Sequence, residues 1–192
     1  MTNHSYKIIK RIVDIFGSFL GLVLIAPFLL VLSFLIKVSS NGPVVYRQIR
    51  IGLHGKAFQL YKLRSMINNA EMNSGPVLAD RNDKRVTIIG KFLRRSRLDE
   101  TLQLINVLKG EMSLVGPRPE RPFFVKQHKV LQGIRLSVKP GLTGLAQVEG
   151  YYHTHPRNKL RYDYIYIKNQ SILLDLKILL KTLFIIFTRS GS

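Results

Sequence analysis

Cysteine is absent from the chain, and acidic residues are few. Without cysteine, neither disulfide bonds nor thiolate zinc sites can hold the fold, and a cysteine nucleophile is excluded. The 192 residues carry 11 Asp and Glu against 30 Lys and Arg, which gives a formal net charge of +19. This excess predicts an anionic partner, such as nucleic acid, phospholipid headgroups or a phosphorylated substrate. No helix-turn-helix, zinc-finger, RRM or KH pattern is visible, so no nucleic-acid partner is expected.

One long stretch of the chain lacks charge altogether. The 22 residues from Ile15 to Ile36 are long enough to cross a bilayer and too long for a signal peptide. Pro27 lies near the middle, where it predicts either a kinked span or a helix that turns back to the face it entered. Positive charge flanks both ends of the stretch, which assigns both ends to the cytoplasm and favours the re-entrant helix.

The remaining patterns predict a small mixed unit of helices and few strands. Residues 44–66 read as two short strands around a glycine-containing turn, and residues 68–83 as a loop. Helical spacing over 88–108 predicts one helix ended by Lys109 and Gly110, with Leu98, Leu102 and Ile105 on one face. The last segment, 171–189, is apolar with sparse cations and predicts an interfacial helix. The expected fold class is therefore mixed α/β and mostly helical.

Asp99 and Glu100 form an adjacent acidic pair that directly follows a basic run. The cations of that run are Lys91, Arg94, Arg95 and Arg97. An ionised Asp can attack a phosphoryl centre, a neighbouring Glu can hold a divalent ion, and arginines can neutralise phosphate oxygens. On spacing alone, the commoner explanation is a salt-bridged start of an amphipathic helix.

Seven segments, in order, resemble the monotopic bacterial sugar transferases, which are polyprenyl-phosphate phosphoglycosyl transferases. The segments are KRIVD (10–14), GPVVYRQIRIG (42–52), YKLRSM (61–66), RLDETLQLINVLKG (97–110), SLVGPRPE (113–120), KPGLTGLAQV (139–148) and LLDLKIL (173–179). The resemblance covers essentially the whole chain. It implies transfer of a sugar-1-phosphate from a UDP-sugar to polyprenyl (undecaprenyl) phosphate with release of UMP.

The resemblance also implies roles for four residues around the acidic pair. Asp99 would be the nucleophile that forms a covalent phosphosugar-aspartate intermediate in a ping-pong reaction. Glu100 would ligate Mg²⁺, a hard cation suited to carboxylate and diphosphate oxygens. Arg94 and Arg118 match family positions that contact phosphate.

At the membrane, the resemblance implies a helix entry marked by Lys10, Arg11 and Asp14. Lys10 and Arg11 could meet a lipid phosphate there, although a simple positive-inside flank explains these two cations equally well. Pro27 matches the helix-breaking proline of the family, but Ala26 replaces the serine that commonly precedes it. We therefore expect residues 1–40 to form a basic flank and a re-entrant helix, and residues 41–192 to form the transferase domain.

The expected location is the cytoplasmic face of the bacterial inner membrane, where a soluble donor meets a lipid acceptor. The chain departs from the family at Tyr151 to His155, where relatives often carry a Gly-Arg sequence. Neither the sugar, the acceptor length nor the pathway follows from the sequence, and a homo-oligomer is compatible with it. The alternatives from other classes are a basic membrane-associated binding protein and a scaffold in polysaccharide assembly. The alternative among enzymes is a UDP-sugar glycosyltransferase that moves the sugar without its phosphate.

Overall fold

A computed structural model describes residues 4–72, 75, 77, 83–150 and 156–188. The helices are α1 (His4–Ser39), α2 (Ile88–Arg95), α3 (Gln103–Lys109), α4 (Pro122–Gln127), α5 (Leu145–Glu149), α6 (Pro156–Lys168) and α7 (Ile172–Thr188). The strands are β1 (Val45–Ile51), β2 (Ala57–Leu63), β3 (Ser113–Val115) and β4 (Gly141–Thr143). Short 3₁₀ turns are η1 (Leu53–Gly55), η2 (Leu98–Glu100), η3 (Lys129–Leu131) and η4 (Gly133–Ser137).

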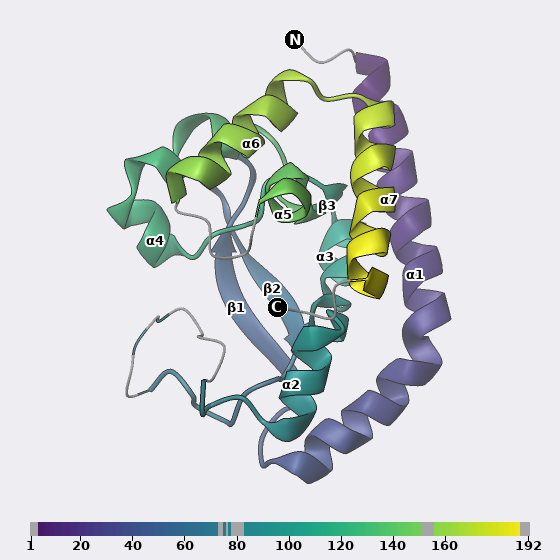
Figure 1. Ribbon diagram of the computed structural model, residues 1–192, viewed down its shortest axis with the longest axis vertical. Helices are drawn as coiled ribbons and strands as arrows, with labels where there is room; N and C mark the ends of the chain where they lie inside the picture. Colours follow the sequence, from purple (N-terminus) through teal and green to yellow (C-terminus); the bar gives the residue numbers. More distant parts are fainter. Residues whose placement is uncertain (1–3, 73–74, 76, 78–82, 151–155, 189–192) are drawn as a thin grey trace.

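The mixed, mostly helical class predicted from the sequence is confirmed. In Figure 1 the β1–β2 hairpin lies between α1 and α7 on one side and α4 and α6 on the other.

Helix α1 is the longest element and lies along one side of the molecule. Its 36 residues span about 54 Å at 1.5 Å per residue, which exceeds the thickness of a bilayer core. The helix continues through Pro27 rather than breaking there, and it bends along its course (Figure 1). One face is buried against the rest of the protein from Asp14 to Ile36, while the opposite face exposes large apolar side chains such as Phe16, Phe28 and Phe34.

The predicted hairpin is confirmed. Strands β1 and β2 pair antiparallel with Val45 opposite Leu63, and the turn at η1 uses the left-handed backbone of His54 and Gly55. Strand β2 packs on both sides. Phe58 and Leu60 pack on the side of α3, and Leu63 packs on the side of α1 and α2. Gln59 of β2 and Ile49 of β1 remain exposed, so the hairpin is partly buried.

The single helix predicted over 88–108 is wrong. Helix α2 ends at Arg95, Arg97 adopts a left-handed conformation with φ of 61°, and the chain passes through η2 before α3 begins. The predicted apolar face is nevertheless correct, because Leu98, Leu102 and Ile105 pack into one cluster with Leu63. The break places Asp99 and Glu100 in a short 3₁₀ turn between two helices, rather than on the side of one helix.

Asn106 joins α3 to the free edge of β2. Its side-chain amide donates to the Gln59 carbonyl at 2.7 Å and accepts from the Tyr61 N–H at 3.1 Å. Gly110 ends α3 with a φ of 81°, as the Lys109-Gly110 pair predicted. A second, parallel strand pair, β3 with β4, follows beside α3. This arrangement fixes α3, and the η2 turn before it, relative to the hairpin.

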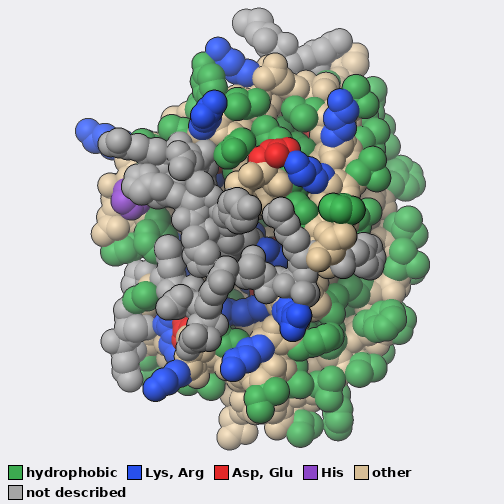
Figure 2. Space-filling view, in the orientation of Figure 1, with side chains coloured by type: hydrophobic (Ala, Val, Ile, Leu, Met, Phe, Trp, Pro, Cys, Tyr) green, Lys and Arg blue, Asp and Glu red, His purple; other side chains and the backbone are tan. Residues whose placement is uncertain are grey.

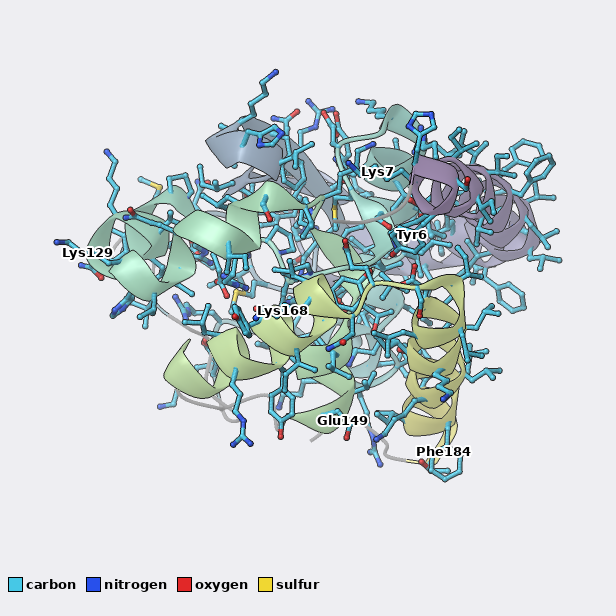
Figure 3. The ribbon with its side chains drawn as sticks, turned by 90° about the horizontal axis from the view of Figure 1, so that it is seen from above. Tyr6, Lys7, Lys129, Glu149, Lys168 and Phe184 are labelled. Atoms are coloured by element: carbon cyan, nitrogen blue, oxygen red, sulfur yellow. The ribbon has the colours of Figure 1, made fainter. Side chains whose placement is uncertain are left out.

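The C-terminal segment is helical, as the sequence predicted. Ser171 begins α7 by accepting a hydrogen bond from the Leu174 N–H with its side chain. Helix α7 runs beside the first half of α1 (Figure 1). Figure 3 shows Phe184 of α7 on the same side of the molecule as the outward-pointing side chains of α1, and Lys129 on the opposite side. The apolar surfaces of the two helices thus lie on one side of the protein.

Candidate active site

Two cations hold Glu100 at the end of η2. Lys62 Nζ donates to Glu100 Oε1 at 2.7 Å, and Arg118 Nη2 donates to the same oxygen at 2.5 Å. Arg118 Nη1 makes a longer contact of 3.3 Å with Oε2. Burial would raise the pKa of Glu100, but the charges of Arg118 and Lys62 outweigh it and hold the pKa well below its usual range. Glu100 therefore stays ionised and anchors Lys62 and Arg118.

Asp99 lies beside this cluster with a different environment. Only 7% of the residue is exposed, and its carboxylate has no hydrogen bond to any residue in the described ranges. Burial raises the pKa of Asp99, Glu100 adds to the increase, and Lys62, Arg94 and Arg118 oppose it. An unbonded carboxylate with cations close by keeps its lone pairs available for an incoming electrophile. The geometry thus separates an anchored carboxylate from an available one.

Lys62 is the member of the cluster to which sequence analysis gave no role. It follows Phe58 and Leu60 at alternating positions of β2, so a lysine occupies the end of a buried stripe. Buried lysines are rare unless an acidic group pairs with them. This alternation was the signal in the sequence that pointed to a buried ion pair.

Arg94 reaches the site from α2. Its Nε donates to the Ser65 hydroxyl at 2.9 Å, and its charge lowers the pKa of Asp99. Gly90 allows α2 to approach this closely, because a Cβ at that position would lie 1.8 Å from the Ser65 carbonyl oxygen. The structure therefore brings together four of the residues that the sequence nominated: Asp99, Glu100, Arg94 and Arg118.

The residues nominated at the membrane entry lie in a separate place. Lys10 Nζ pairs with Asp175 at 2.7 Å and contacts the Tyr166 hydroxyl at 3.2 Å, which joins α1 to α7 and α6. Arg11 donates to the carbonyls of Val107 and Leu108 at the end of α3. Through these contacts, both cations join α1 to other helices.

Asp14 and Pro27 also have structural surroundings. Asp14 is buried and accepts from the Ser113 hydroxyl and the Leu114 N–H, which ties α1 to β3. Pro27 lies within the exposed apolar half of α1. Residues Tyr151 to His155, where the sequence departs from the family pattern, lie outside the described residues.

A comparison with known families decides the identity of the chain. The model of a family described as bacterial sugar transferase matches residues 5–189. The chain belongs to the bacterial sugar transferase family. The resemblance inferred from the seven sequence segments is therefore confirmed.

Relatives of this bacterial sugar transferase carry names from lipid-linked sugar transfer. It is 44% identical to the UDP-glucose:undecaprenyl-phosphate glucose-1-phosphate transferase of Klebsiella pneumoniae, over 95% of this chain and 41% of that protein. It is 42% identical to the UDP-N-acetylgalactosamine-undecaprenyl-phosphate N-acetylgalactosaminephosphotransferase of Aeromonas hydrophila, over 97% of this chain and 45% of that protein. The exopolysaccharide production protein PSS of Rhizobium leguminosarum bv. phaseoli is 38% identical, over 95% of this chain and 96% of that protein. The chain thus spans less than half the length of the first two relatives and nearly all of the third.

Proposed function

We propose that this chain transfers a sugar-1-phosphate from a UDP-sugar to undecaprenyl phosphate, through a covalent intermediate on Asp99. The observation that carries the proposal is the contrast between the two adjacent carboxylates. Asp99 is unbonded within the described residues, whereas Glu100 is held by Lys62 and Arg118. Phosphoryl transfer needs an available nucleophile and cations that neutralise the developing charge, and the cluster supplies both.

The proposed reaction has two displacements at the same phosphorus. First, an Asp99 carboxylate oxygen attacks the phosphorus that bears the sugar, and the bond to the bridging oxygen breaks. UMP leaves with that electron pair, and the sugar phosphate remains on Asp99 as an acyl phosphate. Then an oxygen of undecaprenyl phosphate attacks this phosphorus, and the Asp99 carboxylate leaves. The product is a diphosphate-linked lipid sugar, and the enzyme returns to its starting state.

The cations of the cluster have distinct tasks in this reaction. Arg118 and Lys62 stand against Glu100, within electrostatic reach of Asp99, so they can neutralise phosphate oxygens in the donor and in the transition state. Arg94 lies on the α2 side of the same carboxylate. Phosphate would thus be bound from two sides of Asp99.

Magnesium is a further part of the proposal. Mg²⁺ is usually held by one or two carboxylates together with substrate phosphates. Among the described residues, no group of three metal-binding side chains is present. The adjacent pair Asp99 and Glu100 fits this mode, because Glu100 Oε2 has only the long 3.3 Å contact from Arg118. Glu100 would hold the ion together with the diphosphate, and the ion would neutralise charge on the leaving group.

The proposed location is the cytoplasmic face of the bacterial inner membrane, with α1 as a re-entrant helix. Both ends of α1 are bonded to the same folded unit: Lys10 pairs with Asp175, and Arg64 donates to the Ile36 and Ser40 carbonyls. A straight crossing of the membrane would carry this unit, including its buried charges, into the hydrocarbon. A helix that enters and leaves on one side keeps the unit at the headgroups.

The exposed apolar side of α1 supports the same location. In Figure 2 hydrophobic side chains crowd the edge of the molecule where α1 lies, whereas Lys and Arg side chains are scattered over the described part of the remaining face. An apolar edge beside a basic face suits an anionic membrane surface. At that position the chain would carry out the first membrane step in assembling a polysaccharide or glycoconjugate.

The function is tested with purified protein, magnesium, undecaprenyl phosphate and a panel of UDP-sugars. The expected result is release of UMP with one or a few donors, and loss of that release in Asp99→Asn. Release of UDP would instead indicate transfer of the sugar without its phosphate. The absence of any release across the panel would refute the proposal and return weight to a binding or scaffold role.

The membrane topology has its own test, which the lack of native cysteine makes simple. Single cysteines are placed at His4 and Asn41, next to the two ends of α1, and are labelled in sealed inverted vesicles with an impermeant maleimide. Both positions should react from the cytoplasmic side. Labelling from opposite sides would establish a helix that crosses the membrane.

A further inference from the structure

The loop that carries Arg118 is held through four successive backbone carbonyls. Each carbonyl from Pro117 to Glu120 accepts a hydrogen bond. The donors, in order, are Gly141 N–H at 2.9 Å, Arg135 Nη2 at 3.0 Å, Arg50 Nη1 at 2.9 Å and Ile51 N–H at 3.0 Å. Four bonds from three elements, β4, η4 and β1, leave this loop little freedom.

The sequence of the loop explains why outside donors are needed. Pro117 and Pro119 have no N–H, so neither residue can donate a hydrogen bond to a neighbouring strand. The carbonyls are therefore the backbone groups through which the prolines can be fixed. Arg118 lies between them, and its guanidinium reaches Glu100. Any shift of this backbone would move the guanidinium away from the acidic pair.

Among these donors, Arg135 is held in place by a buried ion pair. The residue is 5% exposed, and its Nε donates to Asp163 Oδ2 at 2.6 Å, while Asp163 is 1% exposed. The pair lies between η4 and α6, and Glu120 approaches Arg135 Nη2 at 3.9 Å. A buried ion pair is weak evidence for a gain in stability, because desolvation offsets the attraction. Fixing a geometry is the better-supported use of such a pair here.

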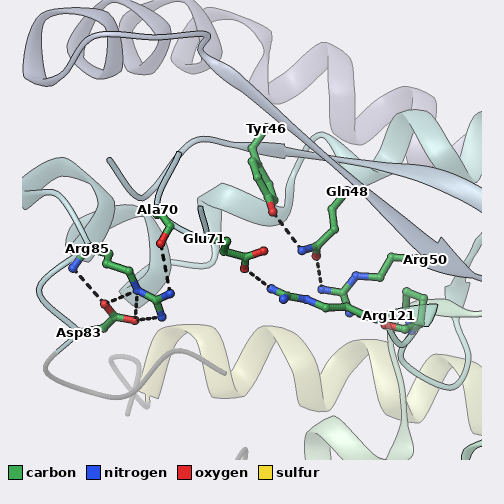
Figure 4. A network of polar contacts seen from close by, with 9 residues as sticks. Tyr46, Gln48, Arg50, Ala70, Glu71, Asp83, Arg85 and Arg121 are labelled. Atoms are coloured by element: carbon green, nitrogen blue, oxygen red, sulfur yellow. Dashed lines mark hydrogen bonds and ion pairs between the residues drawn. The ribbon is translucent and has the colours of Figure 1, made fainter. Parts of the chain in front are cut away.

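Arg50 supports the same loop from the hairpin. Figure 4 shows it in a chain of contacts along one side of β1, in which Arg50 Nη2 donates to Gln48 and Gln48 donates to the Tyr46 hydroxyl. Nearby, Arg121, the residue after Glu120, pairs with Glu71 at 2.6 Å. Arginine side chains therefore hold the loop at Pro119 and at its C-terminal flank.

We infer that Arg135, oriented by Asp163, is a positioning residue that holds the Arg118 backbone so that its guanidinium stays on Glu100. Arg135 acts through Arg118, and we assign it no contact with the substrate. The inference rests on the proposed function, because Arg118 matters for turnover only if the cluster binds phosphate. A residue that fixes the position of a phosphate-binding side chain should affect the rate strongly, because a misplacement of about 1 Å can lower the rate roughly 100-fold.

The first test is a double-mutant cycle between Arg135→Lys and Arg118→Lys, with UMP release as the readout. Lysine keeps the charge at position 135 but cannot hold Asp163 and a carbonyl with one planar fork. We expect Arg135→Lys to lower kcat about 10- to 100-fold. In the Arg118→Lys background the same change should cost less than about twofold, because the guanidinium that it positions is already gone.

Arg64→Lys is the matched control. Arg64 is also 5% exposed and also donates to backbone carbonyls, those of Pro43, Ile36 and Ser40, but it holds the end of α1. The fold-losses in kcat caused by Arg64→Lys and by Arg118→Lys should multiply in the double variant. If the losses from Arg135→Lys and Arg118→Lys also multiplied in their double variant, Arg135 would be a general stabilising residue and the inference would be wrong.

Hydrogen exchange separates positioning from stability and needs no substrate. The amides of Ile51 and Gly141, which donate to the loop, should exchange faster in Arg135→Lys than in Arg64→Lys.

The two proposals fail separately. If the parent chain releases no UMP, the proposed function fails, and hydrogen exchange alone decides whether Arg135 holds the loop. If the parent is active and Arg135→Lys matches Arg64→Lys in the cycle and in the exchange, the positioning role is refuted. Unchanged exchange at Ile51 and Gly141 would refute it as well, whatever the activity.

Discussion

Glu100→Gln removes one negative charge from the centre of the cluster and keeps the shape of the side chain. The change leaves Lys62 and Arg118 without the carboxylate that both of them contact. Truncating one partner of a buried ion pair typically costs 3–5 kcal/mol. The side chains of Lys62 and Arg118 are 16% and 24% exposed, so water screens part of this loss. We therefore expect a destabilisation of about 2–3 kcal/mol, just below the range for a fully buried pair.

This destabilisation is measurable as a fall in the melting temperature. For a chain of this size, 1 kcal/mol corresponds to roughly 2–4 °C, so the expected fall is about 5–10 °C. The assay is thermal unfolding in mild detergent at pH 7 with EDTA present, so that no metal contributes. A role confined to binding Mg²⁺ predicts no fall under these conditions, and that result would refute the anchoring role of Glu100.

The same measurement has a defined dependence on pH. The folded-state pKa of Glu100 is depressed below its unfolded value, so its contribution to stability is present above the unfolded pKa. That contribution is lost as the pH falls through the folded pKa. The melting temperatures of the parent and Glu100→Gln should therefore differ at pH 7 and converge only in acid, as the pH falls below the unfolded pKa and through the depressed folded one.

Asp99→Asn is the matched control in the neighbouring position, because it makes the same chemical change. The folded-state pKa of Asp99 is raised, so the charged carboxylate is less favourable in the folded protein than in the unfolded chain. The Asn variant should be at least as stable as the parent at pH 7. A fall equal to that of Glu100→Gln would contradict the division of roles between the two carboxylates.

Two further changes test the packing around the site. Gly90→Ala places a Cβ 1.8 Å from the Ser65 carbonyl oxygen and should cost about 1–3 kcal/mol in denaturant unfolding, whereas Gly17→Ala, which meets only the mobile end of Leu114 at 2.8 Å, should cost less. Lys10→Met breaks the pair with Asp175 and should lower stability by about 3 kcal/mol, while the KM for the proposed lipid acceptor stays unchanged if the cation serves only to join helices.

The elements with a strong local pattern were predictable from the sequence. The uncharged run predicted α1, the alternating residues around Gly52 and Gly55 predicted the hairpin, and the apolar C-terminal segment predicted α7. In each case burial and backbone geometry follow from neighbours along the chain. The contacts of Lys10 and Arg11 were not predictable in this way, because their partners lie more than 90 residues away.

The error at residues 88–108 had a visible cause. At about 100° per residue, Leu93 and Leu98 would stand about 140° apart on one continuous helix. Leu102 would then face almost opposite to Leu93, yet all three pack into the same cluster with Leu63. Two apolar stripes out of phase cannot both face one core without a break between them. The left-handed Arg97 supplies that break, and the phase shift in the sequence was its signal.

The break also explains how one chain segment gives two adjacent carboxylates opposite roles. A continuous helix would keep its apolar stripe on the core and leave Asp99 and Glu100 to solvent, as surface charges. The reorientation after Arg97 buries both residues at the junction of α2, β2 and α3. Lys62 on β2 and Arg118 on its fixed loop then bind Glu100, which leaves Asp99 unbonded among the described residues. A left-handed residue costs about 1–2 kcal/mol, which the packing of the two stripes can offset. The turn at Arg97, which the predicted helix over 88–108 missed, is thus the feature that places the two carboxylates in the candidate active site.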